Sequence, residues 1–226
     1  MTNNGKLFIV PTPIGNLDDI TYRAIETLKN VDLVLAEDTR KSKILFKKHA
    51  ITTSLKSYHI NNEHRVVNLY VASLVDGKKI ALVSDAGTPS ISDPGFLLIR
   101  ESIKKNIEII CLPGATALIP ALVMSGLPSE KFVFEGFLPK KKGRDSRLKE
   151  LAIEKRTVIL YESPLRVIKT LEDLKEFFGP DRKISLSREI SKIYEETYRG
   201  TIEDAIAHLS NKNPKGEFVI CIDKLV

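Results

Sequence analysis

The chain has 226 residues, of which 42% are hydrophobic, and it contains two cysteines. This length and apolar content suffice to bury a core, so the fold needs neither disulfide bonds nor a metal for stability. Lysine and arginine outnumber aspartate and glutamate by 35 to 29, and the resulting charge of +6 favours a polyanionic partner without establishing one.

We expect no targeting signal in this sequence. The N-terminal residues MTNNGKLFIVPTP lack the charged region, apolar stretch and small-residue cleavage site of a secretory signal. No segment approaches the ~20 apolar residues that span a bilayer, so we expect no membrane contact. Cys111 and Cys221 lie far apart in the apolar runs IEIICLPG and FVICI. We therefore predict that both are buried, in a reducing and thus cytoplasmic setting.

Short apolar runs of strand length alternate along the chain with stretches of helical periodicity, and this alternation predicts an α/β fold. Because the strands are continuously apolar, the pattern indicates a sheet covered by helices on both faces. The strands are expected at Leu7–Val10, Leu33–Ala36, Ile80–Ser84, Glu108–Leu112, Thr157–Tyr161, Lys183–Leu186 and Glu217–Ile222. The helices are expected at Ile20–Leu28, Glu63–Leu74, Gly95–Lys105, Thr116–Met124, Leu165–Phe178 and Ile202–Leu209.

A domain boundary is predicted at Ser125–Lys131, where Gly126 and Pro128 end a helix before strand and helix patterns resume. This boundary gives an N-terminal α/β domain, residues 1–126, and a C-terminal α/β domain, residues 127–226. Pro139–Arg144 (PKKKGR) is polar and basic, and we predict a mobile loop there.

Four turns that follow strands are rich in glycine, proline and small polar residues: Pro11–Asn16, Ser84–Gly95, Pro113–Ala117 and Glu162–Pro164. Such residues often only end strands, but in an open parallel sheet ligands bind beyond the carboxyl ends of the strands. Four such turns together favour a binding pocket. The first turn is neither a dinucleotide fingerprint nor a phosphate loop, and its two prolines remove amide donors that a pyrophosphate would need.

Two aspartates in the second turn allow different interpretations. Asp85 and Asp93 lie among serines and a threonine, a composition that can bind hydroxyl or ammonium groups. The alternative is that each carboxylate bonds its own backbone, and for Asp93, before Pro94 at a helix start, we favour that structural role. Asp85 is the better ligand candidate.

Seven motifs in order along nearly the whole chain resemble one known family. They are VPTPIGNLDDIT (10–21), LAEDTR (35–40), VSDAGTPSISDPG (83–95), LPGATA (112–117), FEGFLPKKKGR (134–144), YESPLR (161–166) and SREISKIYEE (187–196). Together they look like the ribosomal RNA small subunit methyltransferase I family, within the wider tetrapyrrole methylase superfamily. The chain stops at IDKLV, where many members continue into a further small helical region.

The resemblance implies two α/β domains of tetrapyrrole-methylase type with a cofactor cleft between them, a homodimer, and S-adenosylmethionine as methyl donor. The acceptor it implies is the 2′-hydroxyl of a cytidine in 16S rRNA. Carried over residue by residue, the cofactor contacts would be Pro13, Ile14, Asp85, Gly87, Thr88, Ser90, Ile91, Thr116, Ala117, Tyr161, Gly216 and Glu217.

Methyl transfer to a ribose hydroxyl needs a base, or a cation that stabilises the developing oxyanion, because the hydroxyl is a weak nucleophile at neutral pH. Charged candidates near predicted strand ends could equally form surface ion pairs. They are Asp38 and Arg40 in AEDTR, Asn62 and Glu63 in HINNEH, and Arg188, Glu189 and Lys192 in SREISK. We favour the SREISK residues, followed by Asp38, as catalytic.

Basic runs are candidate RNA contacts, although a solvated face is their ordinary explanation. With the family resemblance we favour RNA binding by Arg40, Asn62, Glu63, Lys140, Lys141, Lys142 and Arg144. His59 and His64 lack the spacing of a zinc motif, so we expect no metal site and interpret His59 as an RNA contact or a capped loop residue.

Two other functions stay open from the sequence. A small-molecule methylase acting on a tetrapyrrole would share the cofactor site, but it predicts a less basic surface around the acceptor. A ribosome-assembly protein that binds RNA without catalysis would lack cofactor binding, and the intact glycine-containing turns weigh against it.

Overall fold

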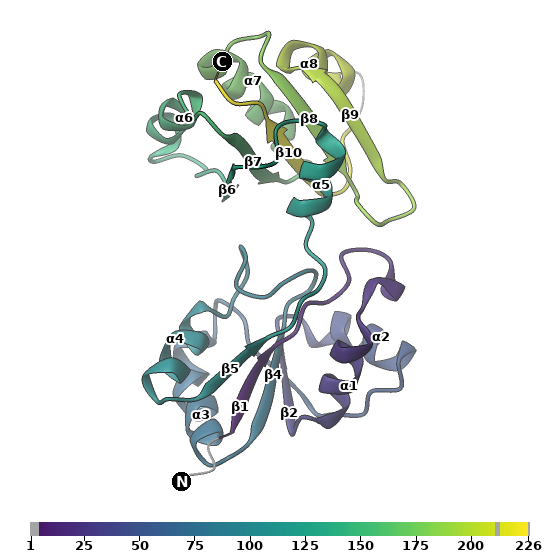
Figure 1. The fold of residues 1–226 in the computed structure, drawn as a ribbon, viewed down its shortest axis with the longest axis vertical. Helices are drawn as coiled ribbons and strands as arrows, with labels where there is room; N and C mark the ends of the chain where they lie inside the picture. Colours follow the sequence, from purple (N-terminus) through teal and green to yellow (C-terminus); the bar gives the residue numbers. More distant parts are fainter. Residues whose placement is uncertain (1–4, 211–212, 226) are drawn as a thin grey trace. The chain divides into compact units, whose positions relative to one another are not determined.

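A computed structural model describes residues 5–210 and 213–225 of the chain. These residues form two compact units, and the division between the units falls between Thr116 and Ala117, in the segment that follows the last strand of the first unit. Figure 1 shows helices packed beside a twisted sheet in each unit. No helix of the described residues is long and apolar enough to cross a membrane.

The first unit is an open, all-parallel sheet with strand order β3-β2-β4-β1-β5. Because its strands run in one direction, the segments after β1, β2, β4 and β5 all emerge at one edge. The elements are β1 (Lys6–Ile9), the 3-10 helix η1 (Leu17–Asp19), α1 (Tyr22–Asn30), β2 (Leu33–Ala36), α2 (Thr39–Lys48), β3 (Leu55–Ser57), α3 (Glu63–Val75), β4 (Lys79–Val83), α4 (Phe96–Lys104) and β5 (Glu108–Cys111).

Helices cover both faces of this sheet, as the continuous apolar strands predict. On one face, Leu35 and Leu82 pack in a buried cluster with Val71 and Leu98, which come from α3 and α4. The other face forms a second cluster with residues of α1 and α2, among them Leu28 and Phe46. Figure 1 shows the same division, with α3 and α4 on one side of the strands and α1 and α2 on the other.

The second unit contains a mixed sheet with strand order β6-β7-β10-β8-β9. β6 and β7 are parallel, whereas β10 is antiparallel to both β7 and β8, and β9 is antiparallel to β8. The elements are α5 (Leu118–Ser125), β6 (Phe132–Phe137), α6 (Arg144–Ala152), β7 (Thr157–Glu162), α7 (Val167–Phe178), β8 (Lys183–Arg188), β9 (Glu196–Thr201), α8 (Ile202–Ser210) and β10 (Phe218–Ile222).

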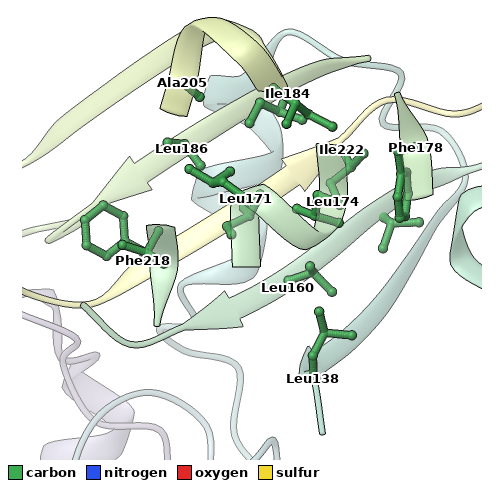
Figure 2. Packing of buried hydrophobic residues seen from close by; sticks show 14 of the residues in the cluster. Leu138, Leu160, Leu171, Leu174, Phe178, Ile184, Leu186, Ala205, Phe218 and Ile222 are labelled. Atoms are coloured by element: carbon green, nitrogen blue, oxygen red, sulfur yellow. The ribbon is translucent and has the colours of Figure 1, made fainter. Parts of the chain in front are cut away.

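One large apolar cluster holds the second unit together. Leu171 and Leu174 of α7 lie against Leu160 and Leu186 of the sheet, and Ala205 of α8 belongs to the same cluster (Figure 2). α5 contacts β7, β8, β9 and β10. Since α6, α7 and α8 share the cluster of Figure 2, this sheet is also packed against helices.

The division of the chain differs from the predicted boundary at residue 126 by ten residues. α5 belongs to the second unit because it packs against strands β8 and β10, so the division falls between Thr116 and Ala117. Gly126 ends α5 in a left-handed conformation, with φ of 70°, as the helix-ending role assigned to it requires. The sequence marked the end of a helix, and that helix opens the second unit.

The two cysteines differ in exposure, which corrects the prediction that both are buried. Cys111 is exposed because β5 is the edge strand of the first sheet. Cys221 lies in the central strand β10, and burial raises the pKa of its thiol to about 12.

Thiol labelling tests this difference, because the thiolate is the reactive species and both burial and a raised pKa suppress it. With a disulfide reagent at pH 8, we expect the native protein to release about one equivalent per chain and the protein in urea about two. Cys111→Ser should abolish the native reaction. Rapid labelling of both thiols in the native protein would contradict the burial of Cys221.

Candidate functional site

Three of the glycine-containing turns predicted to bind a ligand are tied together at the carboxyl edge of the first sheet. Thr12, after β1, and Gly87, after β4, exchange two backbone hydrogen bonds of 2.9 Å. The Thr12 hydroxyl also donates to the Ser84 carbonyl at 3.1 Å. The Thr88 hydroxyl donates to the carbonyl of Ala115, after β5, at 3.0 Å. The turns therefore form one connected surface, which we call the carboxyl-edge cluster (residues 11–16, 84–95 and 113–117).

Two glycines of the carboxyl-edge cluster are required by its geometry. A Cβ at Gly114 would lie 2.6 Å from the Pro11 Cβ, so only glycine lets these two turns approach. Gly87 has φ of 77°, a left-handed conformation that other residues adopt at a cost of roughly 1–2 kcal/mol. These glycines leave open backbone at the point where a flat ligand would approach.

The Ser84–Gly95 segment also carries backbone strain. Ser90 and Ser92 adopt φ of 71° and 64°, values that side-chain-bearing residues rarely adopt. Gly95 has φ of 141°, and a Cβ there would overlap the Leu82 side chain and the Ser90 hydroxyl. Strained backbone of this kind persists only where the surrounding structure holds it in place, and it is common at ligand-binding loops.

Asp85, the favoured ligand candidate of this segment, already has internal partners. Its carboxylate accepts from the Asp38 amide at 2.9 Å and from the Lys41 ammonium at 2.7 Å. These bonds tie the turn after β4 to the start of α2, which follows the neighbouring strand β2. Asp85 thus joins two strand ends, and any ligand would share a carboxylate that is already bonded.

Asp38, a predicted catalytic residue, forms the N-terminal cap of α2. Its side chain accepts from the Arg40 amide at 2.8 Å and from the Arg40 guanidinium at 2.7 Å. These hydrogen bonds from Arg40 lower the pKa of Asp38 to about 2, so it is a weak base at neutral pH. Arg40, a predicted RNA contact, keeps 88% of its side chain exposed.

Asn62 and Glu63, also predicted RNA contacts, stand at the start of α3. The Asn62 carboxamide accepts from the His59 amide at 2.8 Å and donates to the Ser57 carbonyl at 3.2 Å. Asn62 therefore shapes the turn, and His59 is a capped loop residue, one of the two roles predicted for it. The Glu63 carboxylate accepts from the buried Tyr58 hydroxyl at 3.3 Å.

A cleft of about 550 Å³ opens near these strand ends, and it was not predicted from the sequence. We call it the Glu37 cleft; it is lined by Glu37, Ile60, Glu63, His64, Ser92, Asp93, Pro94, Gly95, Phe96, Leu97 and Arg100. Asp93, for which a structural role in its own turn was favoured, belongs to the wall of the cleft, and the N-cap position of α4 is occupied by Gly95. Burial raises the pKa of the Glu37 carboxyl group above its ordinary value, and the nearby negative charge of Asp85 raises it further.

Four predicted residues of the second unit lie near one another at the end of the mixed sheet where β10 begins: Tyr161, Arg188, Gly216 and Glu217. β10 begins beside the ends of β7 and β8, since Val219 pairs with Tyr161 and Phe218 pairs with Arg188. The Tyr161 ring makes edge contacts with Phe134 and Phe137, at centroid distances of 4.9 and 5.8 Å.

Glu189 and Lys192, the preferred catalytic residues, form an ion-pair network with Glu217. The Lys192 ammonium donates to Glu189 at 2.7 Å and to Glu217 at 2.9 Å. The Glu189 carboxylate also accepts from the Glu217 amide at 3.0 Å. Burial raises the pKa of Glu189, but the hydrogen bonds from Lys192 and the Glu217 amide outweigh it, so the net pKa falls below its ordinary value.

This network fixes the segment before β10. A Cβ at Gly216 would overlap the Glu189 side chain, and Glu189 itself adopts φ of 52°. Arg188 donates to Glu196 at 3.2 Å and to the Lys215 carbonyl at 3.4 Å. The network therefore positions Lys215–Glu217. Because its pKa is lowered, the Glu189 carboxylate is also a poorer base than an ordinary glutamate.

Comparison with known proteins identifies the family. The family model for tetrapyrrole (corrin/porphyrin) methylases matches residues 6–206. The ribosomal RNA small subunit methyltransferase I of Synechocystis sp. is 51% identical over 96% of this chain and 78% of its own length. The enzyme of the same name from Thermotoga maritima is 46% identical over 96% of this chain and 98% of its own length. The chain belongs to the ribosomal RNA small subunit methyltransferase I family of tetrapyrrole methylases.

Solved structures show the same fold for this family member and confirm the predicted α/β fold class. The methyltransferase CobJ superposes with a TM-score of 0.71 at 18% identity, covering 97% of this chain and 94% of that one. Uroporphyrin-III C-methyltransferase from Thermus thermophilus, complexed with S-adenyl homocysteine, gives a TM-score of 0.68 at 17% identity, covering 96% of this chain and 97% of that one.

The basic segment of this family member, Lys140–Arg144, divides into exposed and buried residues. Lys140, Lys141 and Lys142 are exposed, as phosphate contacts must be. Arg144, also predicted to bind RNA, is instead held inside the second unit with 12% of its side chain exposed. Its guanidinium donates to Asp173 at 2.8 Å, to the Pro139 carbonyl at 3.0 Å and to the Thr170 hydroxyl at 2.9 Å.

Arg144 belongs to a larger buried network. The Thr170 hydroxyl donates to the buried Glu162 carboxylate at 2.7 Å, and Arg166 donates to the same carboxylate at 2.8 Å. Arg144 bonds both Pro139 and α7, so it anchors the segment that carries Lys140, Lys141 and Lys142, which we call the lysine segment.

In the described part of the chain, no group of three or more His, Cys, Asp or Glu side chains is placed to hold a metal ion.

The anchor has a measurable pH dependence. Burial raises the pKa of Asp173, but hydrogen bonds from Lys169 and Arg144 outweigh it, so the folded pKa lies below the ordinary 3.8. A depressed folded pKa gives stability that is present above pH ~4 and lost as the pH falls through the folded value. Asp173→Asn should therefore lower the free energy of unfolding by about 3 kcal/mol at pH 7, and by less at pH 3.

Urea unfolding at both pH values measures this effect. Glu172→Gln, a neighbour on α7 with 54% of its side chain exposed, is the matched control and should change the free energy of unfolding by less than ~0.5 kcal/mol. An equal effect of the two substitutions at pH 7 would contradict the anchoring role.

Proposed function

We propose that the chain transfers the methyl group of S-adenosylmethionine to the ribose 2′-hydroxyl of a cytidine in 16S rRNA. The observation that carries this proposal is the 46% identity to the T. maritima ribosomal RNA small subunit methyltransferase I, which extends over nearly the full length of both chains. The carboxyl-edge cluster supplies the independent physical support.

The first unit contains features that fit such a cofactor. Gly87 and Gly114 leave space that a Cβ would fill or strain, next to the buried Pro13 and the half-buried Ile14. Thr88, Ser90, Ile91, Thr116 and Ala117 belong to the same carboxyl-edge cluster, so these proposed cofactor contacts are consistent with the geometry. The cofactor roles of Asp85, Tyr161, Gly216 and Glu217 stay predictions from the family resemblance.

Positioning accounts for most of the chemistry required. The sulfonium supplies an activated methyl group, so the protein must hold the acceptor oxygen in line with it at near-attack distance. A covalent intermediate is not needed for a displacement of this kind. The catalytic roles of Asp38, Arg188, Glu189 and Lys192 stay predictions, since each of these side chains also has a structural role.

RNA binding is proposed for the exposed cations. Lys140–Lys142 and Arg40 present positive charge to solvent, as phosphate contacts require. Asn62 and Glu63 stay candidates at the turn before α3, while Arg144 anchors its segment from inside. A homodimer and a cytoplasmic location also stay predictions.

Methyl transfer tests the proposed function directly. We expect radiolabelled methyl groups from S-adenosylmethionine to appear on small ribosomal subunits that lack the modification, at one ribose 2′-oxygen in nuclease mapping. Cofactor binding by calorimetry without label on RNA would favour a small-molecule methylase, and absence of cofactor binding would favour a non-catalytic RNA-binding protein. Either result would overturn the proposal.

The lysine segment has its own test. Replacing Lys140, Lys141 and Lys142 with alanine should weaken RNA binding and lower the slope of log affinity against log salt by about 2, because up to three phosphate contacts are lost. Affinity for S-adenosylmethionine should not change. The control with matched charge replaces the exposed Lys155, Lys175 and Lys224 of the same unit. Equal effects of the two triple variants on the slope would contradict a specific contact.

A further inference from the structure

The Glu37 cleft adjoins the predicted cofactor segment and is separate from it. The Ser84–Gly95 turn contributes Asp85–Ile91 to the predicted cofactor contacts, and its remaining residues, Ser92–Gly95, line the cleft. Glu37 enters from the end of β2, the strand next to β4. A molecule in this cleft would therefore lie beside the turn that is proposed to bind the methyl donor.

The size of the cleft suits one nucleoside. Its volume of about 550 Å³ falls within the range of roughly 300–1,000 Å³ that is typical of small-molecule sites. Part of its wall comes from the starts of α3 and α4, which pack against each other on one face of the first sheet (Figure 1). The rest comes from the turns that precede these helices and from Glu37, which follows β2.

Its apolar wall offers a surface for a base. Phe96 is 66% exposed and Ile60 is 70% exposed, although both belong to the lining of a cleft. The Arg100 guanidinium lies over the Phe96 ring, 5.3 Å from its centroid. This cation–π contact occupies one face of the ring and holds the ring in place. Proteins that bind unpaired RNA stack bases on exposed aromatic rings of this kind.

Its polar lining is acidic, because it contains Glu37, Glu63 and Asp93 beside one arginine and one histidine. Carboxylates disfavour a phosphate group inside the cleft, but they accept hydrogen bonds from ribose hydroxyls and from amino groups of bases. A glutamate that accepts from the N4 amino group is a recurrent means of recognising cytosine. Uracil places an acceptor oxygen at the same position, so a carboxylate rejects it.

We propose that the Glu37 cleft binds the base and ribose of one unstacked cytidine, with the base against Phe96 and its amino group donating to Glu37. This assignment rests on the proposed function, which supplies cytidine as the acceptor, and it names the residues that select that base. The raised pKa of Glu37 agrees with a carboxyl group held in a partly desolvated wall. The phosphates stay outside the acidic wall.

Binding of short RNAs to the full chain tests the assignment. The probes are a heptauridylate and the same oligonucleotide with one central cytidine or guanosine, measured by calorimetry with S-adenosylmethionine present. We expect the cytidine probe to bind about tenfold more tightly than the heptauridylate, since one base-specific contact contributes 1–3 kcal/mol. A guanosine probe that binds as tightly as the cytidine probe would overturn the choice of cytidine, because guanine also offers an amino group.

Variants separate the two contacts. Glu37→Ala should remove the preference for cytidine over uridine, and Glu37→Gln, which keeps an acceptor oxygen and the side-chain volume, should retain part of it. Phe96→Ala should weaken binding of the cytidine probe about tenfold, because a stacking contact is lost. The controls are Ile103→Ala, an exposed apolar residue on the same helix, and Glu108→Ala, an exposed glutamate on β5. Both controls should bind as the unchanged protein does.

The outcomes distinguish the cleft from the proposed function. If the protein methylates ribosomal RNA but shows no cytidine preference, or one that Glu37→Ala leaves intact, the cleft assignment fails and the function stands. If it transfers no methyl group to ribosomal RNA yet shows a cytidine preference that depends on Glu37, the proposed function fails and the cleft assignment stands.

Discussion

The parallel direction of the strands in the first sheet is the constraint on which the candidate site depends. Because β1, β2, β4 and β5 run the same way, residues that are far apart in sequence meet at one edge. There the turn after β4 bonds the three other strand ends: Gly87 bonds Thr12, Asp85 accepts from the Asp38 amide, and Thr88 donates to the Ala115 carbonyl. Without that common direction, the turns would point to opposite ends of the sheet, and no connected surface would form.

The second unit shows how buried charge can position exposed charge. Arg144 and Glu162 lie inside a network of hydrogen bonds, and the lysines beside Arg144 remain at the surface. The Lys192 network fixes Gly216 and Glu217 in a similar way. A buried ion pair such as Arg144–Asp173 contributes little net stability, but removing one partner is costly, so the pair defines the conformation of the segments it bonds.

The sequence predicted those parts of the fold where local pattern and burial agree. β2 and β4 were visible as continuous apolar runs because both faces of a central strand are covered. Three edge strands, β3, β6 and β9, were missed. β3 and β9, of the sequences LKS and ETYRGT, bury little and carry polar residues. α2 and α6 were missed because their lysines and arginines hide the apolar face, and α6 begins within the segment predicted as a loop.

The candidate site was predictable only where it depends on neighbours in sequence. The glycine and proline turns were found because their composition reports the backbone they form. The burial of Arg144 could not be seen, because its partner Asp173 lies 29 residues further along the chain. Glu37 was passed over for Asp38, its neighbour in LAEDTR, because only the fold shows that Glu37 lines the cleft and Asp38 caps a helix.

The central claim, that the methyl donor binds at the carboxyl edge of the first sheet, is tested most directly by amide hydrogen exchange with and without S-adenosylmethionine. Binding should slow exchange in residues 12–16, 84–91 and 114–117, because a ligand there protects the open backbone of the turns, and it should leave α6 unchanged. Cofactor binding that is measurable by calorimetry but slows exchange only outside these turns would contradict the account.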